Sequence, residues 1–222
     1  MSADTPQEHR RQSLNALAAD VFGDAQRVGC AEVATADPGL LFPDERTAIA
    51  KAVPARQREF AAGRLAARAA MGVDVSIAMA SDRAPIWPVG IAGSITHAGG
   101  WALAVTLSSD CLVGIDLELD EPLPSGVLET VLTLSERQWI HSQTTPEAWA
   151  RVIFSVKECA YKAQYARSGQ LFGFEMFEVS LNPTTRQFTA TFQAEAAPFA
   201  TGDQLSGRFA IGGGFILTGL LA

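Results

Sequence analysis

Hydrophobic positions recur along the chain with two different spacings, which predict helices in some segments and strands in others. In the helical segments they recur every three or four residues, as at Leu14, Leu17 and Ala18. The segment before Leu14 is polar, so we expect a mobile tail over residues 1–13. The breakers in residues 82–93 predict an ordered loop. The predicted helices cover residues 14–23, 54–71, 127–141 and 147–166.

Two apolar runs near the middle of the chain predict a β-hairpin. They cover residues 101–107 and 111–119, and the turn-forming residues Ser108, Ser109 and Asp110 separate them. The chain becomes strand-like again after its last predicted helix. These later strands are expected over residues 172–181 and 188–193 and in the glycine-rich segment 209–222.

The order of these elements indicates the fold class. Both halves of the chain combine helices with antiparallel strands, which favours an α+β fold over an alternating parallel one. We predict a first half over residues 14–111 and a second half over residues 112–222. The two halves are expected to form one compact unit.

Composition argues against several classes of protein. Acidic residues outnumber basic ones 24 to 17, which gives a net charge of -7 and argues against a nucleic-acid or membrane-surface binder. The apolar stretch over residues 209–222 is too short to span a bilayer, and the polar first residues do not resemble a signal peptide. The three cysteines are widely separated, which fits a reducing cytoplasm.

Two carboxylates lie two residues apart in the predicted strand over residues 111–119. Side chains alternate along a strand, so Asp116 and Glu118 share one face. Neighbouring like charges repel, and a hard cation such as Mg²⁺ would neutralise them. The alternative is a strand face exposed to water.

A third carboxylate, Glu158, lies between two lysines on the helix predicted over residues 147–166. Glu158 and Lys162 are four residues apart and share a helix face, with Lys157 beside them. A surface salt bridge worth about 0.3–0.5 kcal/mol would be a simple explanation. However, the chain has three lysines against fourteen arginines, and two of the three flank Glu158. Compact ammonium groups in this position favour a phosphate site.

Two further groups of residues could contact an anion. His97 lies in a loop-like segment of small residues, where backbone donors and hydroxyls can reach a phosphate; a structural histidine is the alternative. Arg56, Arg64 and Arg68 lie on one broad sector of the predicted helix over residues 54–71, and Arg83 follows in the loop. For these arginines, a hydrated surface is the alternative.

Five sequence blocks in this order resemble the 4′-phosphopantetheinyl transferase superfamily. The match is to its long single-chain branch, of the surfactin synthetase activator and enterobactin synthetase component D type. The blocks are the arginine helix at residues 56–64, RAPIWPVG at 83–90, GSITH at 93–97, GIDLE at 114–118 and FSVKECAYKA at 154–163.

The resemblance implies a pseudo-two-fold pair of similar α+β halves with the active site between them. It implies coenzyme A as a co-substrate and Mg²⁺ as the metal, with Mn²⁺ as an alternative. The implied reaction transfers 4′-phosphopantetheine to a serine of an apo acyl, peptidyl or aryl carrier protein and releases adenosine 3′,5′-bisphosphate. It suggests a cytoplasmic monomer that serves siderophore, non-ribosomal peptide, polyketide or fatty acid synthesis.

The resemblance also assigns roles to individual residues. The metal ligands would be Asp116, Glu118 and Glu158, and the catalytic residues would be Asp116, Glu158 and Lys162. Lys162 would contact the pyrophosphate of coenzyme A. The other residues expected at coenzyme A are Arg56, Arg64, Arg83, Thr96, His97 and Lys157.

Two departures from the family pattern and the identity of the base leave questions open. Thr96 stands where many relatives have serine, which keeps the hydroxyl, and Cys159 stands where serine usually follows the glutamate. Glu158 is the usual candidate for the base. A carboxylate bound to Mg²⁺ has a lowered pKa, so a water bound to the metal is an alternative.

Two other functions remain compatible with these residues. A Mg²⁺-dependent phosphohydrolase would use the same carboxylates with water as nucleophile, and it would hydrolyse coenzyme A without a carrier protein. A non-catalytic coenzyme A or nucleotide-binding module would still bind its ligand after loss of Glu158.

Overall fold

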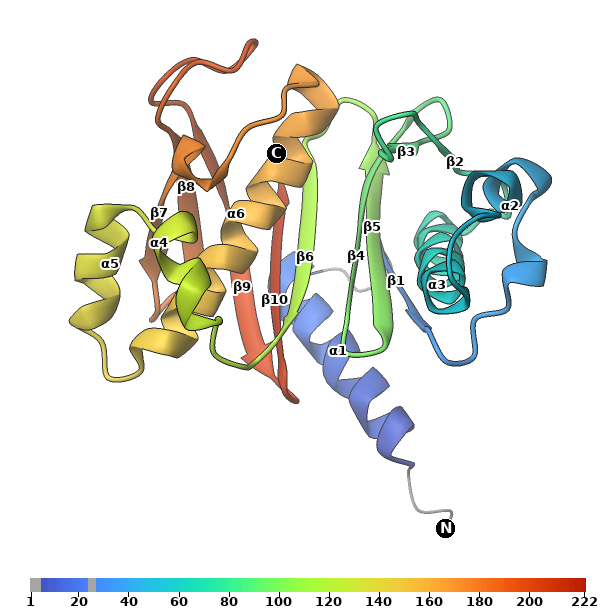
Figure 1. The fold of residues 1–222 in the computed structure, drawn as a ribbon, viewed down its shortest axis with the longest axis horizontal. Helices are drawn as coiled ribbons and strands as arrows, with labels where there is room; N and C mark the ends of the chain where they lie inside the picture. The colour runs from blue at the N-terminus through green and yellow to red at the C-terminus, as the bar shows by residue number, and fades with distance from the viewer. Residues whose placement is uncertain (1–4, 24–26) are drawn as a thin grey trace.

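The computed structural model describes residues 5–23 and 27–222, whose strands form two antiparallel sheets and a short ribbon (Figure 1). The strands are β1 (Val28–Glu32), β2 (Ala78–Met79), β3 (Pro85–Ile86), β4 (Ile91–Ala98), β5 (Trp101–Ser108), β6 (Val113–Leu119), β7 (Phe177–Asn182), β8 (Gln187–Phe192), β9 (Gln204–Gly212) and β10 (Phe215–Leu221). The smaller sheet has the order β1-β5-β4, and the larger has the order β6-β10-β9-β8-β7. Strands β2 and β3 form the ribbon.

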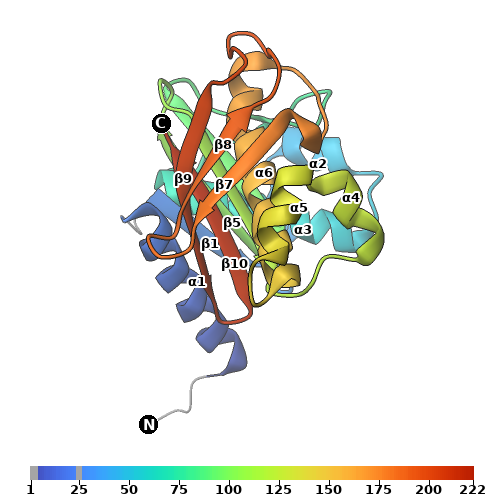
Figure 2. The same ribbon diagram turned by 90° about the vertical axis from the view of Figure 1, so that its left-hand side faces the viewer.

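Helices cover both faces of the sheets (Figures 1 and 2). They are α1 (Pro6–Phe22), α2 (Pro43–Ile49), α3 (Pro54–Met71), α4 (Leu128–Val131), α5 (Leu134–His141) and α6 (Pro146–Ser168), with the 3-10 turns η2 (Pro38–Leu40), η3 (Ser125–Val127) and η4 (Phe174–Met176). Helix α3 packs on the smaller sheet and α6 on the larger one. The predicted α+β fold is confirmed. No helix in the described ranges is long and apolar enough to cross a membrane.

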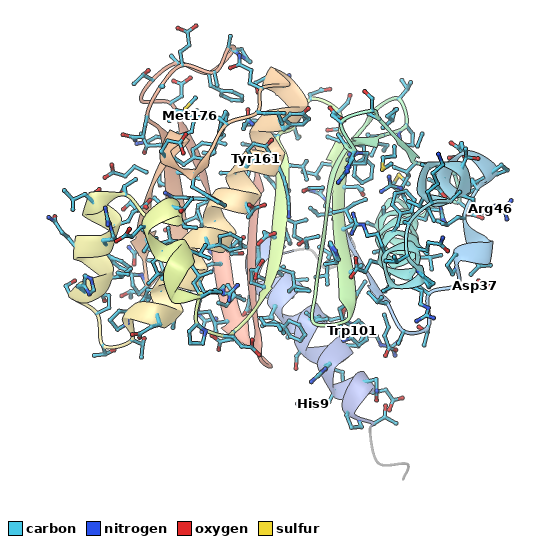
Figure 3. The ribbon with its side chains drawn as sticks, in the orientation of Figure 1. His9, Asp37, Arg46, Trp101, Tyr161 and Met176 are labelled. Carbon is cyan, nitrogen blue, oxygen red and sulfur yellow. The ribbon has the colours of Figure 1, made fainter. Side chains whose placement is uncertain are left out.

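Helix α1 lies on the opposite face of the sheets from α3 and α6, and it joins the two halves (Figure 2). Leu14 and Leu17 belong to one buried cluster with Leu103 of β5 and Ile115 of β6. Trp101, labelled in Figure 3 at the start of β5, belongs to the same cluster. The two sheets therefore share a hydrophobic core.

The first helix begins earlier than the hydrophobic pattern predicts. Thr5 caps it: the Thr5 hydroxyl accepts the Glu8 N–H at 3.2 Å, and the Glu8 carboxylate accepts the Thr5 N–H at 2.8 Å. Such a capping box satisfies backbone groups that have no partner within the helix. Residues 6–13, for which a mobile tail is predicted, belong to α1 in the structure, and residues 1–4 lie outside the described part of the chain.

The prediction that the two central strands, β5 and β6, pair as a hairpin is wrong, although both strands exist. Strand β5 has a partner on each edge, β1 and β4, so neither edge is open to β6, which pairs with β10 instead. The tight turn comes before β5 in the chain, where Gly99 and Gly100 connect β4 to β5. Their φ angles of 57° and 82° are left-handed, a conformation that glycine adopts without steric cost. The segment after β5 leads the chain into the second sheet.

Strands β4 and β6 lie side by side where the two sheets meet (Figure 1), and side-chain hydroxyls link them. The Ser94 hydroxyl accepts the Ile115 N–H at 3.3 Å, and the Thr96 hydroxyl accepts the Leu117 N–H at 3.0 Å. These side chains satisfy buried donors that a backbone ladder would otherwise pair. The segment containing His97 is thus a strand, and its prediction as a loop was wrong.

Other elements match the predictions in type and differ in their limits. Helix α3 has the predicted bounds. The helix predicted over residues 127–141 is divided, because Thr133 caps α5 by accepting the Glu136 N–H at 3.3 Å. The strand predicted from residue 172 begins at Phe177, since η4 precedes it.

Candidate active site

Two adjoining cavities lie where the halves meet, beside Tyr161 of α6, which Figure 3 labels. The first has a volume of about 330 Å³ and the second about 380 Å³, and His97 and Lys162 line both. The first cavity is also lined by Arg56, Arg64, Asp82, Arg83, Tyr161 and Tyr165. The second is also lined by Thr96, Asp116, Glu118, Phe154 and Glu158. Residues from both halves thus form one continuous site.

The Asp116 carboxylate is buried and has three hydrogen-bond donors. Lys162 Nζ lies 2.6 Å from Asp116 Oδ1, and Thr96 donates to the same oxygen at 3.2 Å. Ser155 donates to Asp116 Oδ2 at 2.9 Å. Buried charges are stable only when paired and hydrogen-bonded, so this network holds Asp116 in one orientation.

A glycine lets α6 approach Asp116 closely. A Cβ atom at Gly114 would lie 2.3 Å from the carbonyl oxygen of Cys159, so no side chain fits between β6 and α6 there. Cys159 itself is buried, and burial strongly raises the pKa of its thiol. The thiol therefore stays protonated and shielded from the cavity.

Glu118 lies on the same face of β6 and is paired with Arg151, whose Nη1 is 2.9 Å from Glu118 Oε2. The same guanidinium donates to the carbonyl oxygens of Glu121 and Pro122, both at 2.9 Å. Burial raises the pKa of Glu118 to about 7, with Asp116 adding to this rise and Arg151 opposing it. Sequence reasoning missed Arg151, because its position on α6 carries no local sign of a partner on β6.

Glu158 and Lys162 face the same cavity from α6. Burial raises the pKa of Glu158, Lys162 opposes this rise and Asp116 adds to it. Burial alone would lower the pKa of Lys162, but Asp116 and Glu158 outweigh this effect and raise it. Lys162 therefore stays protonated at neutral pH.

The donor chemistry of this cavity suits a hard divalent cation. Asp116, Glu118 and Glu158 offer carboxylate oxygens, and burial, with the charge of Asp116 adding to it, raises the pKa of the two glutamates. As the side chains stand, Lys162 occupies Asp116 and Arg151 occupies Glu118. Within residues 5–23 and 27–222, no three Asp, Glu, His or Cys side chains converge closely enough to hold a metal ion in this arrangement. Binding would require one or both cationic side chains to turn aside.

His97 belongs to a polar cluster at the edge of the first cavity. Its Nε2 lies 3.2 Å from Arg56 Nη1 and 3.4 Å from Glu59 Oε2, and Arg56 pairs with Glu59 at 3.1 Å. Burial lowers the pKa of His97, Glu59 opposes this, and Arg56 adds to the lowering. His97 is therefore mostly neutral at pH 7. Arg83 is exposed and lines the same cavity.

Lys157 has a different place from the predicted one. Its side chain is 1% exposed, and Nζ bonds Glu136 Oε2 at 2.8 Å and the carbonyl oxygens of Val131 and Phe174 at 2.8 and 3.1 Å. An ammonium group has three donors, so none is left for a phosphate. Lys157 instead links α6 to Glu136 of α5 and to the backbone at Val131 and Phe174.

Arg64 and Thr96 also serve the protein's own structure. Arg64 is buried, donates from Nε to the Ile77 carbonyl oxygen at 2.7 Å and lies 4.2 Å from the centroid of the Phe60 ring. Thr96 is 3% exposed and links β4 to Leu117 and Asp116. Both line the cavities, but neither offers the exposed charge that Arg56 and Arg83 offer.

Comparison with known proteins identifies the family. The 4′-phosphopantetheinyl transferase N-terminal domain matches residues 44–107, and the 4′-phosphopantetheinyl transferase superfamily domain matches residues 112–212. This chain belongs to the 4′-phosphopantetheinyl transferase superfamily. The first matched region contains Arg56, Arg83 and His97, and the second contains Asp116 and Lys162.

Two relatives named as 4′-phosphopantetheinyl transferases are similar over most of the chain, and a third relative is similar over a shorter part. The 4′-phosphopantetheinyl transferase Svp of Streptomyces mobaraensis is 39% identical over 197 residues, which cover 83% of this chain and 80% of Svp. The 4′-phosphopantetheinyl transferase PptT of Mycobacterium tuberculosis is 33% identical over 223 residues, 92% of this chain and 95% of PptT. Enterobactin synthase component D of Salmonella typhi is 35% identical over 136 residues, 58% of this chain and 57% of that protein.

The activity follows from the family and the site together. The protein is a 4′-phosphopantetheinyl transferase, which moves 4′-phosphopantetheine from coenzyme A to an apo carrier protein. Arginine, histidine and lysine side chains line the first cavity, and carboxylates line the second.

Proposed function

We propose that Asp116, Glu118 and Glu158 hold Mg²⁺, or Mn²⁺, in the second cavity. The carboxylates around one hollow, two of them with raised pKa values, support this assignment. When bound, the ion neutralises charge on the pyrophosphate oxygens of coenzyme A. Arg151 then leaves Glu118 and Lys162 leaves Asp116, and each pairs with another carboxylate or with a phosphate.

Coenzyme A occupies the first cavity in this proposal, with its pyrophosphate at Lys162. Lys162 lines both cavities, so its ammonium group lies between the metal ligands and the cationic pocket. Arg56, Arg83 and His97 face the adenine and 3′-phosphate end. Arg64 supports this wall from behind, since its Nε is bonded to the Ile77 carbonyl oxygen.

The chemical step then depends on few side chains. The carrier serine oxygen attacks the phosphorus that bears pantetheine, and the bond from this phosphorus to the bridging oxygen breaks. Glu158, which lines the second cavity beside Lys162, is the proposed acceptor of the serine proton. Lys162 offsets the negative charge that develops on the departing adenosine 3′,5′-bisphosphate.

The proposed position of coenzyme A is tested by comparing the rates of transfer from coenzyme A and from dephospho-coenzyme A, which lacks the 3′-phosphate. The wild type should prefer coenzyme A, and Arg56→Ala, Arg83→Ala and His97→Ala should each shrink this preference about tenfold, as expected for a charge-assisted contact. Intact-mass analysis of an apo carrier protein measures the transfer. An unchanged preference in all three variants would contradict the placement. Hydrolysis of coenzyme A without a carrier would favour the phosphohydrolase.

The carrier and the cellular setting are also proposals. Some relatives are named enterobactin synthase component D, so we propose that carriers of siderophore or other secondary-metabolite synthesis are the substrates. We further propose that the protein works as a cytoplasmic monomer. A panel of apo acyl, peptidyl and aryl carrier proteins, assayed in parallel, would rank the substrates.

A further inference from the structure

Arg83 lies in a tight turn between β2 and β3, with a left-handed backbone at φ 75°. Residues other than glycine adopt this conformation only where surrounding contacts hold it. The Arg83 N–H donates to the Ala80 carbonyl at 2.9 Å, and the Ala80 N–H donates to the Ala84 carbonyl at 2.9 Å. Asp82 Oδ1 accepts the Ala84 N–H at 2.9 Å. One carboxylate oxygen of Asp82 thus serves the turn itself.

The second oxygen of Asp82 accepts a hydrogen bond from the other half of the protein. Tyr165 of α6 donates from its hydroxyl to Asp82 Oδ2 at 2.5 Å, over a sequence separation of 83 residues. The Tyr165 ring stacks on Tyr161, with centroids 5.9 Å apart and planes at 26°, which orients the hydroxyl. Figure 1 shows the β2–β3 connection and the C-terminal end of α6 at the same end of the molecule.

Both partners of this contact line the cavity in which we place coenzyme A. Asp82, Arg83, Tyr161 and Tyr165 all line it, together with Lys162. Arg83 is exposed, and the backbone of the turn sets the point from which its side chain reaches the cavity. The bond from Tyr165 ties that backbone to the helix that carries Lys162.

We infer that Tyr165 is a positioning residue for Arg83, acting through Asp82. By fixing the turn against α6, it sets the distance between Arg83 at the 3′-phosphate end of coenzyme A and Lys162 at the pyrophosphate. The inference rests on the proposed role of Arg83. It makes recognition of the 3′-phosphate depend on a residue that need not touch the ligand.

The protonation states of the pair suit this role. The bond from Tyr165, followed by that from Ala84, lowers the pKa of Asp82, so the carboxylate stays charged and accepts. The same bond raises the pKa of Tyr165, which keeps its proton and donates. Each carboxylate oxygen of Asp82 thus accepts one hydrogen bond, Oδ1 from the Ala84 N–H and Oδ2 from the Tyr165 hydroxyl.

The experiment is calorimetric titration of coenzyme A and dephospho-coenzyme A into the full chain, with Mg²⁺ present. The proteins are wild type, Tyr165→Phe, Arg83→Ala and the double variant. Tyr165→Phe keeps the stacked ring and removes only the hydroxyl. It should weaken coenzyme A binding about three- to tenfold and leave dephospho-coenzyme A nearly unchanged. In the Arg83→Ala background it should cause no further loss.

Arg167→Gln is the matched control. Arg167 follows on the same helix and donates to the Asp110 carbonyl oxygen of the first half, and it does not line the cavity. Its loss should leave the preference for coenzyme A unchanged. Asp82→Ala removes the acceptor of the Tyr165 hydroxyl, is expected to reduce the preference for coenzyme A as Tyr165→Phe does, and keeps the experiment decisive if Tyr165→Phe does not fold.

Two results would overturn the inference while the role of Arg83 survives. One is an Arg83→Ala variant that loses discrimination while Tyr165→Phe and Asp82→Ala keep it. The other is a Tyr165→Phe variant that weakens both ligands equally, or weakens coenzyme A further in the Arg83→Ala background, as a general structural role would. If Arg83→Ala itself leaves both affinities unchanged, the proposed role of Arg83 fails and the inference fails with it.

Discussion

Replacing Thr96 with valine tests how the two sheets are joined. Valine has nearly the shape of threonine but no hydroxyl, so the Leu117 N–H loses its acceptor at 3.0 Å. Asp116 Oδ1 loses a donor at 3.2 Å, although Lys162 and Ser155 still contact that carboxylate. Leu117 and Asp116 are 1% and 3% exposed, so water cannot easily replace either partner.

The expected loss can be worked out from these two bonds. A buried N–H without a partner costs about 1–3 kcal/mol, and a hydrogen bond to a charged group is worth about 1.5–3 kcal/mol. Because Asp116 keeps two other donors, we expect Thr96→Val to lower the free energy of unfolding by about 2–4 kcal/mol. Ser94→Ala removes the corresponding acceptor of the Ile115 N–H without touching Asp116, so about 1–2 kcal/mol is expected.

Equilibrium urea unfolding, followed by circular dichroism, measures these differences. Thr96→Ser keeps the hydroxyl and is the matched control, expected within about 1 kcal/mol of wild type. Transfer activity of folded Thr96→Val should also fall, because Asp116 is less firmly oriented. A Thr96→Val protein as stable as Thr96→Ser would refute the reasoning, as would a Ser94→Ala protein that loses more stability than Thr96→Val.

Two further predictions concern buried charges. The pKa of Glu118 is raised to about 7 from an ordinary 4.5. Between pH 4.5 and pH 7, therefore, the Glu118 carboxyl keeps its proton in the folded protein but has lost it in the unfolded chain. The free energy of unfolding, measured in a chelating buffer, should therefore fall as pH rises through this range, by at most about 3 kcal/mol. In Glu118→Gln this fall should be smaller. Parallel pH profiles of the wild type and the variant would contradict the prediction. Lys157→Met leaves the Glu136 carboxylate buried without its cation and should lower the unfolding free energy by about 3–5 kcal/mol. If the variant instead stays stable and its KM for coenzyme A rises sharply, Lys157 contacts the substrate after all.

Local patterns were enough to predict several features of this protein. Helix α3 has the bounds that Pro54 and Gly72 indicate, because turn and cap preferences act over a few residues. The alternation along β6 correctly places Asp116 and Glu118 on one face, since the side-chain period of a strand is independent of its partners. The family blocks led to the transferase activity, because the residues of each block lie close together in sequence.

The tertiary structure alone decided how these pieces meet. Strand β6 pairs with the distant β10, because both edges of β5 are already taken, and no local pattern records this. Lys157 turns to Glu136, and Tyr165 crosses to Asp82, although nothing near either residue in sequence indicates the partner. Periodicity fixes which face a side chain occupies. The partner of a buried charge depends instead on which distant segments pack against that face, and this is set by the burial of the whole core.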